Sequence, residues 1–141
     1  MRSAVTQLAK SKIDVPLDIN TGIHDGHTGS VPASHALRAF NAVALPTDRI
    51  ADPAIASMVS SRAVPAELRF SGTDPLYATR PVLMRRVSEK TRITVFDGEH
   101  EILHEAALTW LEAQAKASPP VWAVEGHKPP VLRQAVAPSG W

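Results

Sequence analysis

The sequence predicts an α/β fold, because strand-like runs and helical patterns alternate along the chain. The runs at residues 17–23 and 91–96 each lead through a polar loop into a stretch with helical periodicity. A third run, at residues 82–87, is separated from the 91–96 run by three residues, which suits a hairpin. With 141 residues, 44% of them hydrophobic and 21% charged, the composition fits one globular domain.

The first third of the chain predicts a helix, a strand and a second helix. Residues 1–12 have the spacing of a short amphipathic helix, and Leu17–Ile23 alternates like a strand. A polar loop, His24–Ser30, follows, and Pro32 then suits the first turn of a helix over Pro32–Ala44. The residues expected on the buried face of that helix are Leu37, Phe40, Val43 and Ala44.

The rest of the chain predicts a loop-rich stretch, a hairpin, a helix and a tail. Prolines and turn residues recur through residues 45–80, so we expect loops and short helices there. The hairpin at residues 82–96 leads through a second polar loop into a helix. The predicted buried face of this helix is Leu103, Ala106, Ala107, Trp110, Leu111 and Gln114. Residues 118–141 are rich in proline and predict an extended tail.

Four residues have simple structural interpretations at this stage. Arg85 and Arg86 are interpreted as a solvated pair on a strand edge. Trp110, at helical spacing, is interpreted as a core residue. For Trp122 we favour an exposed tail over docking on a partner chain.

Composition and charge exclude several classes of function. The formal net charge is +1 without a basic block, so no electrostatic footprint for nucleic acid is present. There is no cysteine, which excludes disulfides, thiolate chemistry and cysteine-based zinc sites. No apolar run is long enough for a signal peptide or a membrane span. We therefore predict neither a nucleic-acid nor a membrane partner, and cytoplasmic placement only by default.

Two polar residues, Asp25 and His100, each lie at the end of a predicted strand and ahead of a helix. The carboxyl ends of adjacent parallel strands meet at one edge of a sheet, so we expect the two side chains to be close. A carboxylate against an imidazole Nδ1–H fixes the tautomer and stabilises the imidazolium, which is half of a nucleophile relay. The alternatives are a turn-stabilising role for Asp25 and an exposed loop position for His100. His104, four residues later, is a weaker candidate base.

The motifs around these two residues resemble the α/β-hydrolases, and in particular the prolyl-oligopeptidase-like serine hydrolases. Gly22-Ile23-His24-Asp25 followed by Val31-Pro32 is similar to their acid loop. Phe96-Asp97-Gly98-Glu99-His100 and the helix after it resemble their last strand, histidine loop and last helix. The resemblance implies that Asp25 is the triad acid and His100 the triad base, in the chain order of these enzymes. Residues 1–117 would then be the C-terminal portion of such a domain, holding the last strands and helices of the sheet.

Three features depart from the family pattern. Residues 45–80 lengthen the gap between acid and base and look like an insertion, and Glu99 replaces a glycine that often precedes the histidine. No Gly-x-Ser-x-Gly is present anywhere, so the nucleophile elbow and the oxyanion hole are missing. The sequence thus predicts a hydrolase segment that is inactive alone, with an ester or peptide substrate once the full domain is assembled. Association would use an exposed sheet edge.

Other interpretations remain open. The runner-up is a non-catalytic remnant or interaction module that keeps part of the fold. A third is a small metal-binding protein using His24, Asp25 and His27, although no helix or hairpin enforces that spacing as a zinc site. Our prediction is that the chain holds no metal and no cofactor. A phosphate-binding loop at Gly22, Gly26 and Gly29 is discounted, because the P-loop Lys-Ser/Thr is absent.

Overall fold

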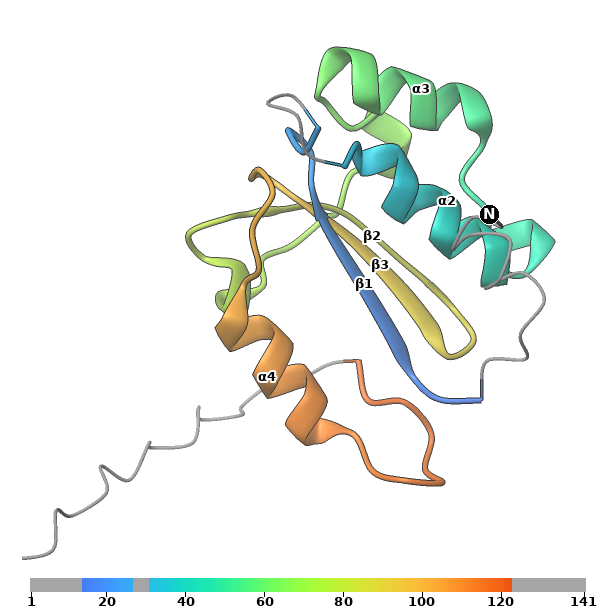
Figure 1. The fold of residues 1–141 in the computed structure, drawn as a ribbon, viewed down its shortest axis with the longest axis vertical. Helices are drawn as coiled ribbons and strands as arrows, with labels where there is room; N and C mark the ends of the chain where they lie inside the picture. The colour runs from blue at the N-terminus through green and yellow to red at the C-terminus, as the bar shows by residue number, and fades with distance from the viewer. Residues whose placement is uncertain (1–13, 27–30, 123–141) are drawn as a thin grey trace, which may run out of the picture.

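A three-stranded mixed sheet with helices on both faces forms the centre of the computed structural model (Figure 1), which describes residues 14–26 and 31–122. The strands are β1 (Leu17–Gly22), β2 (Val82–Ser88) and β3 (Thr91–Phe96), in the spatial order β1-β3-β2. The predicted α/β class is confirmed, and so are the three strands. The helix predicted over residues 1–12 lies outside the described residues.

The strand register brings the ends of β1 and β3 to one edge of the sheet. β1 runs parallel to β3, with Leu17 opposite Thr91 and Gly22 opposite Phe96. β2 is antiparallel to β3 and joined to it by the predicted hairpin, in which Glu89 has a left-handed φ of 49°. In the described part of the chain, no strand pairs with the outer edge of β1. β1 is therefore an edge strand of the sheet as described.

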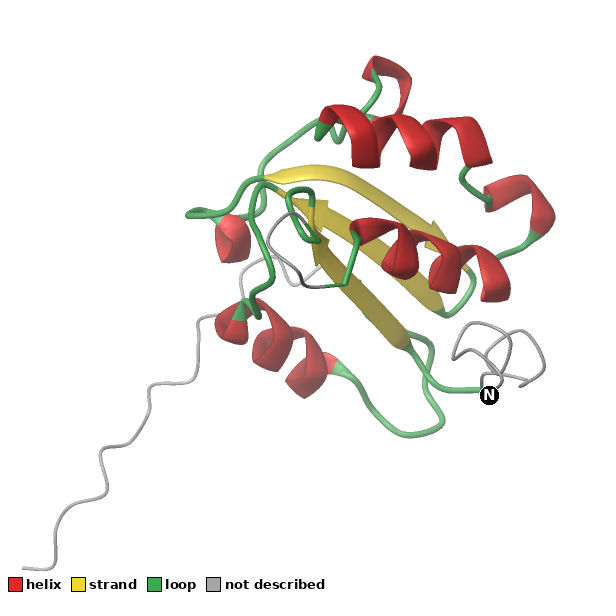
Figure 2. Cartoon of the chain, turned by 45° about the horizontal axis from the view of Figure 1, so that its top comes forward, coloured by secondary structure: helices red, strands yellow, loops and turns green. Residues whose placement is uncertain are grey.

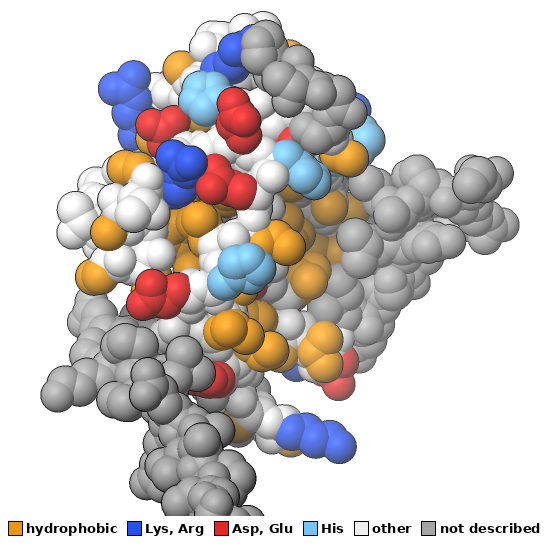
Figure 3. All heavy atoms as spheres, turned by 60° about the vertical axis from the view of Figure 1, so that its left-hand side comes forward, with side chains coloured by type: hydrophobic (Ala, Val, Ile, Leu, Met, Phe, Trp, Pro, Cys, Tyr) orange, Lys and Arg blue, Asp and Glu red, His pale blue; other side chains and the backbone are white. Residues whose placement is uncertain are grey.

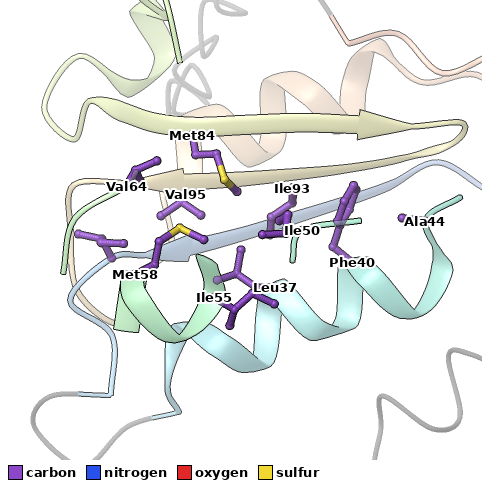
Figure 4. Close-up of a cluster of buried hydrophobic side chains, with 11 residues drawn as sticks. Leu37, Phe40, Ala44, Ile50, Ile55, Met58, Val64, Met84, Ile93 and Val95 are labelled. Carbon is purple, nitrogen blue, oxygen red and sulfur yellow. The ribbon is translucent and has the colours of Figure 1, made fainter. Parts of the chain in front are cut away.

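One face of the sheet is apolar and is covered by α2 (Ala33–Val43) and α3 (Asp52–Ser61) (Figure 2). Pro32 precedes α2 and Pro53 lies in the first turn of α3, where a missing N–H costs no hydrogen bond. The buried cluster between these helices and the sheet (Figure 4) consists of Ile23, Leu37, Phe40, Ala44, Ile50, Ile55, Met58, Val64, Met84, Ile93 and Val95. Because α3 supplies Ile55 and Met58, part of the 45–80 stretch belongs to the core.

The opposite face carries buried polar groups. Asp18 and Arg92 form a two-pronged ion pair there, at 2.7 and 3.0 Å, and both side chains are at most 5% exposed. The Tyr77 hydroxyl donates a hydrogen bond to the Asn20 side chain. Asp18 and Asn20 are poor strand formers, and these long-range partners explain why they are tolerated in β1. A smaller apolar cluster, Tyr77, Phe96 and Ala106, lies beside them.

The last helix, α4 (His104–Ala113), lies on this polar side and is only partly covered. Its predicted buried face is partly wrong, because Ala106 is buried while Ala107 is exposed and Leu111 is 60% exposed. Trp110 is half-buried and stacks on Trp122, with ring centroids 6.1 Å apart. Trp122 is therefore packed against the domain, contrary to its prediction as part of an exposed tail, and the residues after it lie outside the description.

The short helical turns between α2 and β2 agree with the loop-rich prediction. They are η1 (Pro46–Asp48), η2 (Ala66–Leu68) and η3 (Pro75–Tyr77). Asp74 caps η3, because its side chain accepts a hydrogen bond from the Leu76 N–H at 3.0 Å. η3 places Tyr77 against the polar face of the sheet.

Candidate functional site

The two polar loops that follow β1 and β3 lie side by side at one edge of the sheet. Backbone hydrogen bonds continue past the strands, from the Ile23 N–H to the Phe96 carbonyl and from the His24 N–H to the Gly98 carbonyl. These bonds measure 2.9 and 3.0 Å. The parallel register of β1 and β3 therefore extends into the loops and sets the distance between their side chains.

Glycine makes this close approach possible. A Cβ at Gly22 would overlap the carbonyl oxygens of Gly98 and Glu99 in the neighbouring loop. Gly26 turns the loop after β1 with φ +90°, a conformation that side-chain-bearing residues rarely adopt. The close approach of the two loops and the turn after β1 thus explain Gly22 and Gly26 without reference to any chemical role of the loops.

The predicted contact between Asp25 and His100 is present. The His100 Nδ1 lies 3.0 Å and 3.2 Å from the two oxygens of the Asp25 carboxylate, and because a carboxylate only accepts hydrogen bonds, this contact calls for a proton on Nδ1. The Asp25 side chain is 11% exposed, whereas the His100 side chain is 67% exposed. A partly buried carboxylate holding the Nδ1 side of an exposed imidazole leaves Nε2 as the nitrogen that can exchange protons with a substrate or nucleophile. Their predicted roles as acid and base stay predictions.

A second histidine–aspartate pair, which the sequence reasoning missed, crosses the same two loops. The His24 Nε2 lies 3.0 Å from an Asp97 carboxylate oxygen. Here the loop after β1 provides the histidine and the loop after β3 the carboxylate, the reverse of the Asp25–His100 pair. Each of the two loops carries an aspartate and at least one histidine near the strand end, but the sequence by itself does not show which of them pair. The other predicted loop histidine, His27, lies outside the described residues.

An open hollow of about 470 Å³ borders the site, and both His24 and His100 line it. Its other charged lining includes Arg80, which is paired with Glu101 at 2.8 Å, and Glu99. Figure 3 shows histidine, acidic and basic side chains gathered over the upper part of one face of the molecule. The hollow is therefore a polar surface depression and offers no apolar pocket.

The described residues place no hydroxyl nucleophile on the His100 ring. Among the described residues, His100 has no hydrogen-bonded hydroxyl, and His104, the weaker candidate base, is exposed on α4. The described residues likewise contain no group of three metal-ligating side chains, and the third member of the suggested His24, Asp25, His27 site is not among them. No helix in the described residues has the length and hydrophobicity to span a membrane.

Comparisons of the chain with protein-family models, with curated proteins and with solved structures find no match. The resemblance to the prolyl-oligopeptidase-like hydrolases therefore rests on the two loop motifs and their order. What stands independently of that resemblance is a small mixed α/β domain with two crossed histidine–aspartate pairs at one edge of its sheet.

Proposed function

We propose that this chain supplies the acid and base of a serine-hydrolase relay whose nucleophile comes from outside the 141 residues. The observation that carries the proposal is the hydrogen bond between Asp25 and the His100 Nδ1–H at the carboxyl ends of two parallel strands. That is the position at which open α/β sheets hold their reactive groups. An α/β-hydrolase sheet needs more strand–helix units, each of about 30 residues, than this chain contains.

In the proposed reaction, His100 Nε2 removes the proton from a serine hydroxyl as the oxygen attacks the carbonyl carbon of an ester or peptide. Asp25 stabilises the imidazolium that forms and keeps Nδ1 protonated. His100 then gives the proton to the leaving group, and the same steps with water release the acid product. The oxyanion-stabilising N–H groups would come with the serine, from the other part of the fold.

The outer edge of β1 is where we expect the remaining strands to pair. β1 is an edge strand in the described part of the chain, while β3 is already flanked on both sides. A strand added there would place its own carboxyl end beside Asp25, within the geometry of a continuing parallel sheet. In this proposal, the association through a sheet edge that the sequence predicts is the pairing of an added parallel strand with the outer edge of β1.

The second candidate is an interaction module without catalysis. It is favoured by the exposed apolar side chains of Ile102, Leu108 and Leu111 in and beside α4. Such exposure is common in surfaces that are covered by a partner. This exposure fits both the hydrolase segment and the interaction module, so a measurement of hydrolysis is needed to distinguish the two.

The test begins with the coding sequence upstream of Met1 and in neighbouring genes, searched for a Gly-x-Ser-x-Gly segment. That segment is co-expressed with the chain, and hydrolysis of a p-nitrophenyl ester is measured together with fluorophosphonate labelling of the serine. We expect hydrolysis only when both parts are present, and a loss of about 10⁴-fold or more in His100→Ala. His104→Ala, on an exposed histidine four residues later, is the matched control and should keep full activity. Hydrolysis by the chain alone, or a folded but inactive pair, would overturn the proposal.

A further inference from the structure

The two histidine–aspartate pairs have unequal support around them. Asp25 is held in a partly buried position, but the His100 ring is two-thirds exposed and extends from a loop. His24 and Asp97 form their contact one residue before Asp25 and three residues before His100, so their pair connects the two loops next to the relay. A single bond to a carboxylate fixes a ring poorly unless the backbone on both sides is also held.

In the described part of the chain, the loop after β3 (residues 97–103, the base loop) is held by hydrogen bonds and an ion pair on either side of His100. The Asp97 N–H donates to the Pro81 carbonyl at 2.9 Å, and the Gly98 carbonyl accepts from His24. On the far side of His100, Glu101 pairs with Arg80. Among the described residues, the bond between the His24 ring and the Asp97 carboxylate joins the base loop to the loop after β1 (residues 23–26, the acid loop) through side chains, as the relay pair does.

We propose that His24 and Asp97 are positioning residues, whose pairing holds the base loop against the acid loop so that the His100 Nδ1–H stays on Asp25. For its effect on hydrolysis this inference rests on the proposed function, but its geometric effect can be measured on this chain by itself. An exposed pair contributes little to overall stability. Its consequence is therefore expected in the orientation of His100, while the fold is kept.

The test measures which ring nitrogen of His100 carries the proton, from the ring ¹⁵N chemical shifts of the full chain. Measurement at a pH of about 8.5 lies above the ordinary imidazole range. We expect the wild-type ring to be mainly the Nδ1–H tautomer. His24→Ala and Asp97→Ala should each lower the ratio of Nδ1–H to Nε2–H by about twofold to fivefold, the size expected from an exposed pair. The double variant should be no worse than either single one.

Two further variants separate positioning from general loosening of the loops. Asp97→Glu keeps the carboxylate and should restore most of the wild-type ratio. Lys90→Gln removes the Lys90–Asp14 pair, which also joins the β1 and β3 regions but at the opposite end of the strands, and should leave the ratio unchanged. Circular dichroism checks that each variant is folded. If Asp97→Ala does not fold, the tautomer ratio of His100 in His24→Ala tests the proposal.

An unchanged tautomer ratio in folded His24→Ala and Asp97→Ala would overturn the proposal. So would a wild-type His100 that is mainly the Nε2–H tautomer, because the Asp25 contact would then be absent. If the ratio falls as expected but the co-expressed pair hydrolyses no ester, the positioning role stands and the proposed hydrolase function fails. The two proposals are therefore tested by different measurements.

Discussion

The two faces of the sheet are built on different physical principles. On the face that packs against α2 and α3, buried aliphatic and aromatic side chains such as Leu37, Phe40 and Ile93 fill the space. On the other face, the buried groups include Asp18 and Arg92, with the Arg92 guanidinium 5.3 Å from the Trp122 ring centre. Apolar contacts are tolerant of small shifts, whereas a two-pronged ion pair is satisfied in one register only. We therefore expect the first face to supply most of the stability, and the second to specify how β1 lies against β3.

The largest expected effect comes from the apolar face. Phe40→Ala removes a fully buried ring from the centre of the cluster and leaves a cavity. We expect it to lower the free energy of unfolding by about 3–5 kcal/mol, measured by urea denaturation. If the loss were below about 1 kcal/mol, the apolar face would not be the main source of stability.

A nearly equal effect is expected from one half of the buried ion pair. Asp18→Ala leaves the Arg92 charge buried without its carboxylate, and we expect a loss of about 3 kcal/mol. The value lies at the low end for buried pairs because Arg92 keeps its hydrogen bond to the Trp122 carbonyl. Replacing both partners, as in Asp18→Leu with Arg92→Met, should cost less than about 1.5 kcal/mol by the same measurement. Additive losses in the double variant would contradict the view that this pair contributes specificity more than stability.

Alkaline pH should weaken the polar face selectively. Burial raises the pKa of Tyr77 above its ordinary value of 10.0, and the Asp18 carboxylate raises it further against the opposing effect of Arg85 and Arg92. Well below pH 10 the phenol is neutral in both folded and unfolded chains, so its contribution to stability is fully present. Above that pH the unfolded chain loses the proton more readily, and the free energy of unfolding should fall as pH rises through the folded-state pKa.

Urea denaturation between about pH 9 and pH 11 measures this effect, with Tyr77→Phe as the control. The variant loses the hydrogen bond to Asn20, which should cost about 1 kcal/mol at neutral pH. Its stability should then fall less steeply with pH than that of the wild-type chain. Parallel pH curves for the two proteins would show that Tyr77 is not the group responsible.

The smallest effect is expected on α4, outside both packed faces. Leu111→Ser changes a side chain that is 60% exposed, and we expect the free energy of unfolding to change by no more than about 0.5 kcal/mol. Leu37→Ala, a fully buried leucine, is the matched comparison and should cost about 2–5 kcal/mol. A large loss in Leu111→Ser would mean that α4 is covered in solution.

Much of the site could be predicted from the two strand ends. The glycine, aspartate and histidine residues around Asp25 and His100 follow strand-like runs, and parallel pairing brings such ends together. The His24–Asp97 pair was not predictable in the same way, because each residue alone looks like an ordinary loop residue. The pair follows from the register of β1 against β3, which places His24 beside the loop after β3.

The arginines Arg85 and Arg86 do lie on an edge strand, β2, as predicted, but the expectation that they are solvated failed for a related reason. When only the neighbouring residues are considered, two adjacent arginines indicate a solvated strand edge. Arg85 is instead half-buried, with a 2.8 Å ion pair to Asp74 and its guanidinium 5.2 Å from the Tyr77 ring centre. Arg86 donates to backbone carbonyls of η1 and the residue after it. The ion-pair partner of Arg85 and these backbone partners of Arg86 lie in the loop-rich residues 45–80. The residue pattern of β2 alone does not indicate these partners.

The sequence by itself determined the order of strands and helices, the hairpin, and the two residues at the strand ends. These features follow from short-range causes, namely side-chain periodicity, proline and glycine, which act within a few residues. Only the tertiary structure decided that Asp18 meets Arg92, that His24 meets Asp97, and that Leu111 is left exposed while Trp122 packs. Each of these contacts depends on which distant segments of the chain become neighbours. Burying a polar side chain costs free energy unless a partner is in place, so the partner has to be known before the role of the side chain can be assigned.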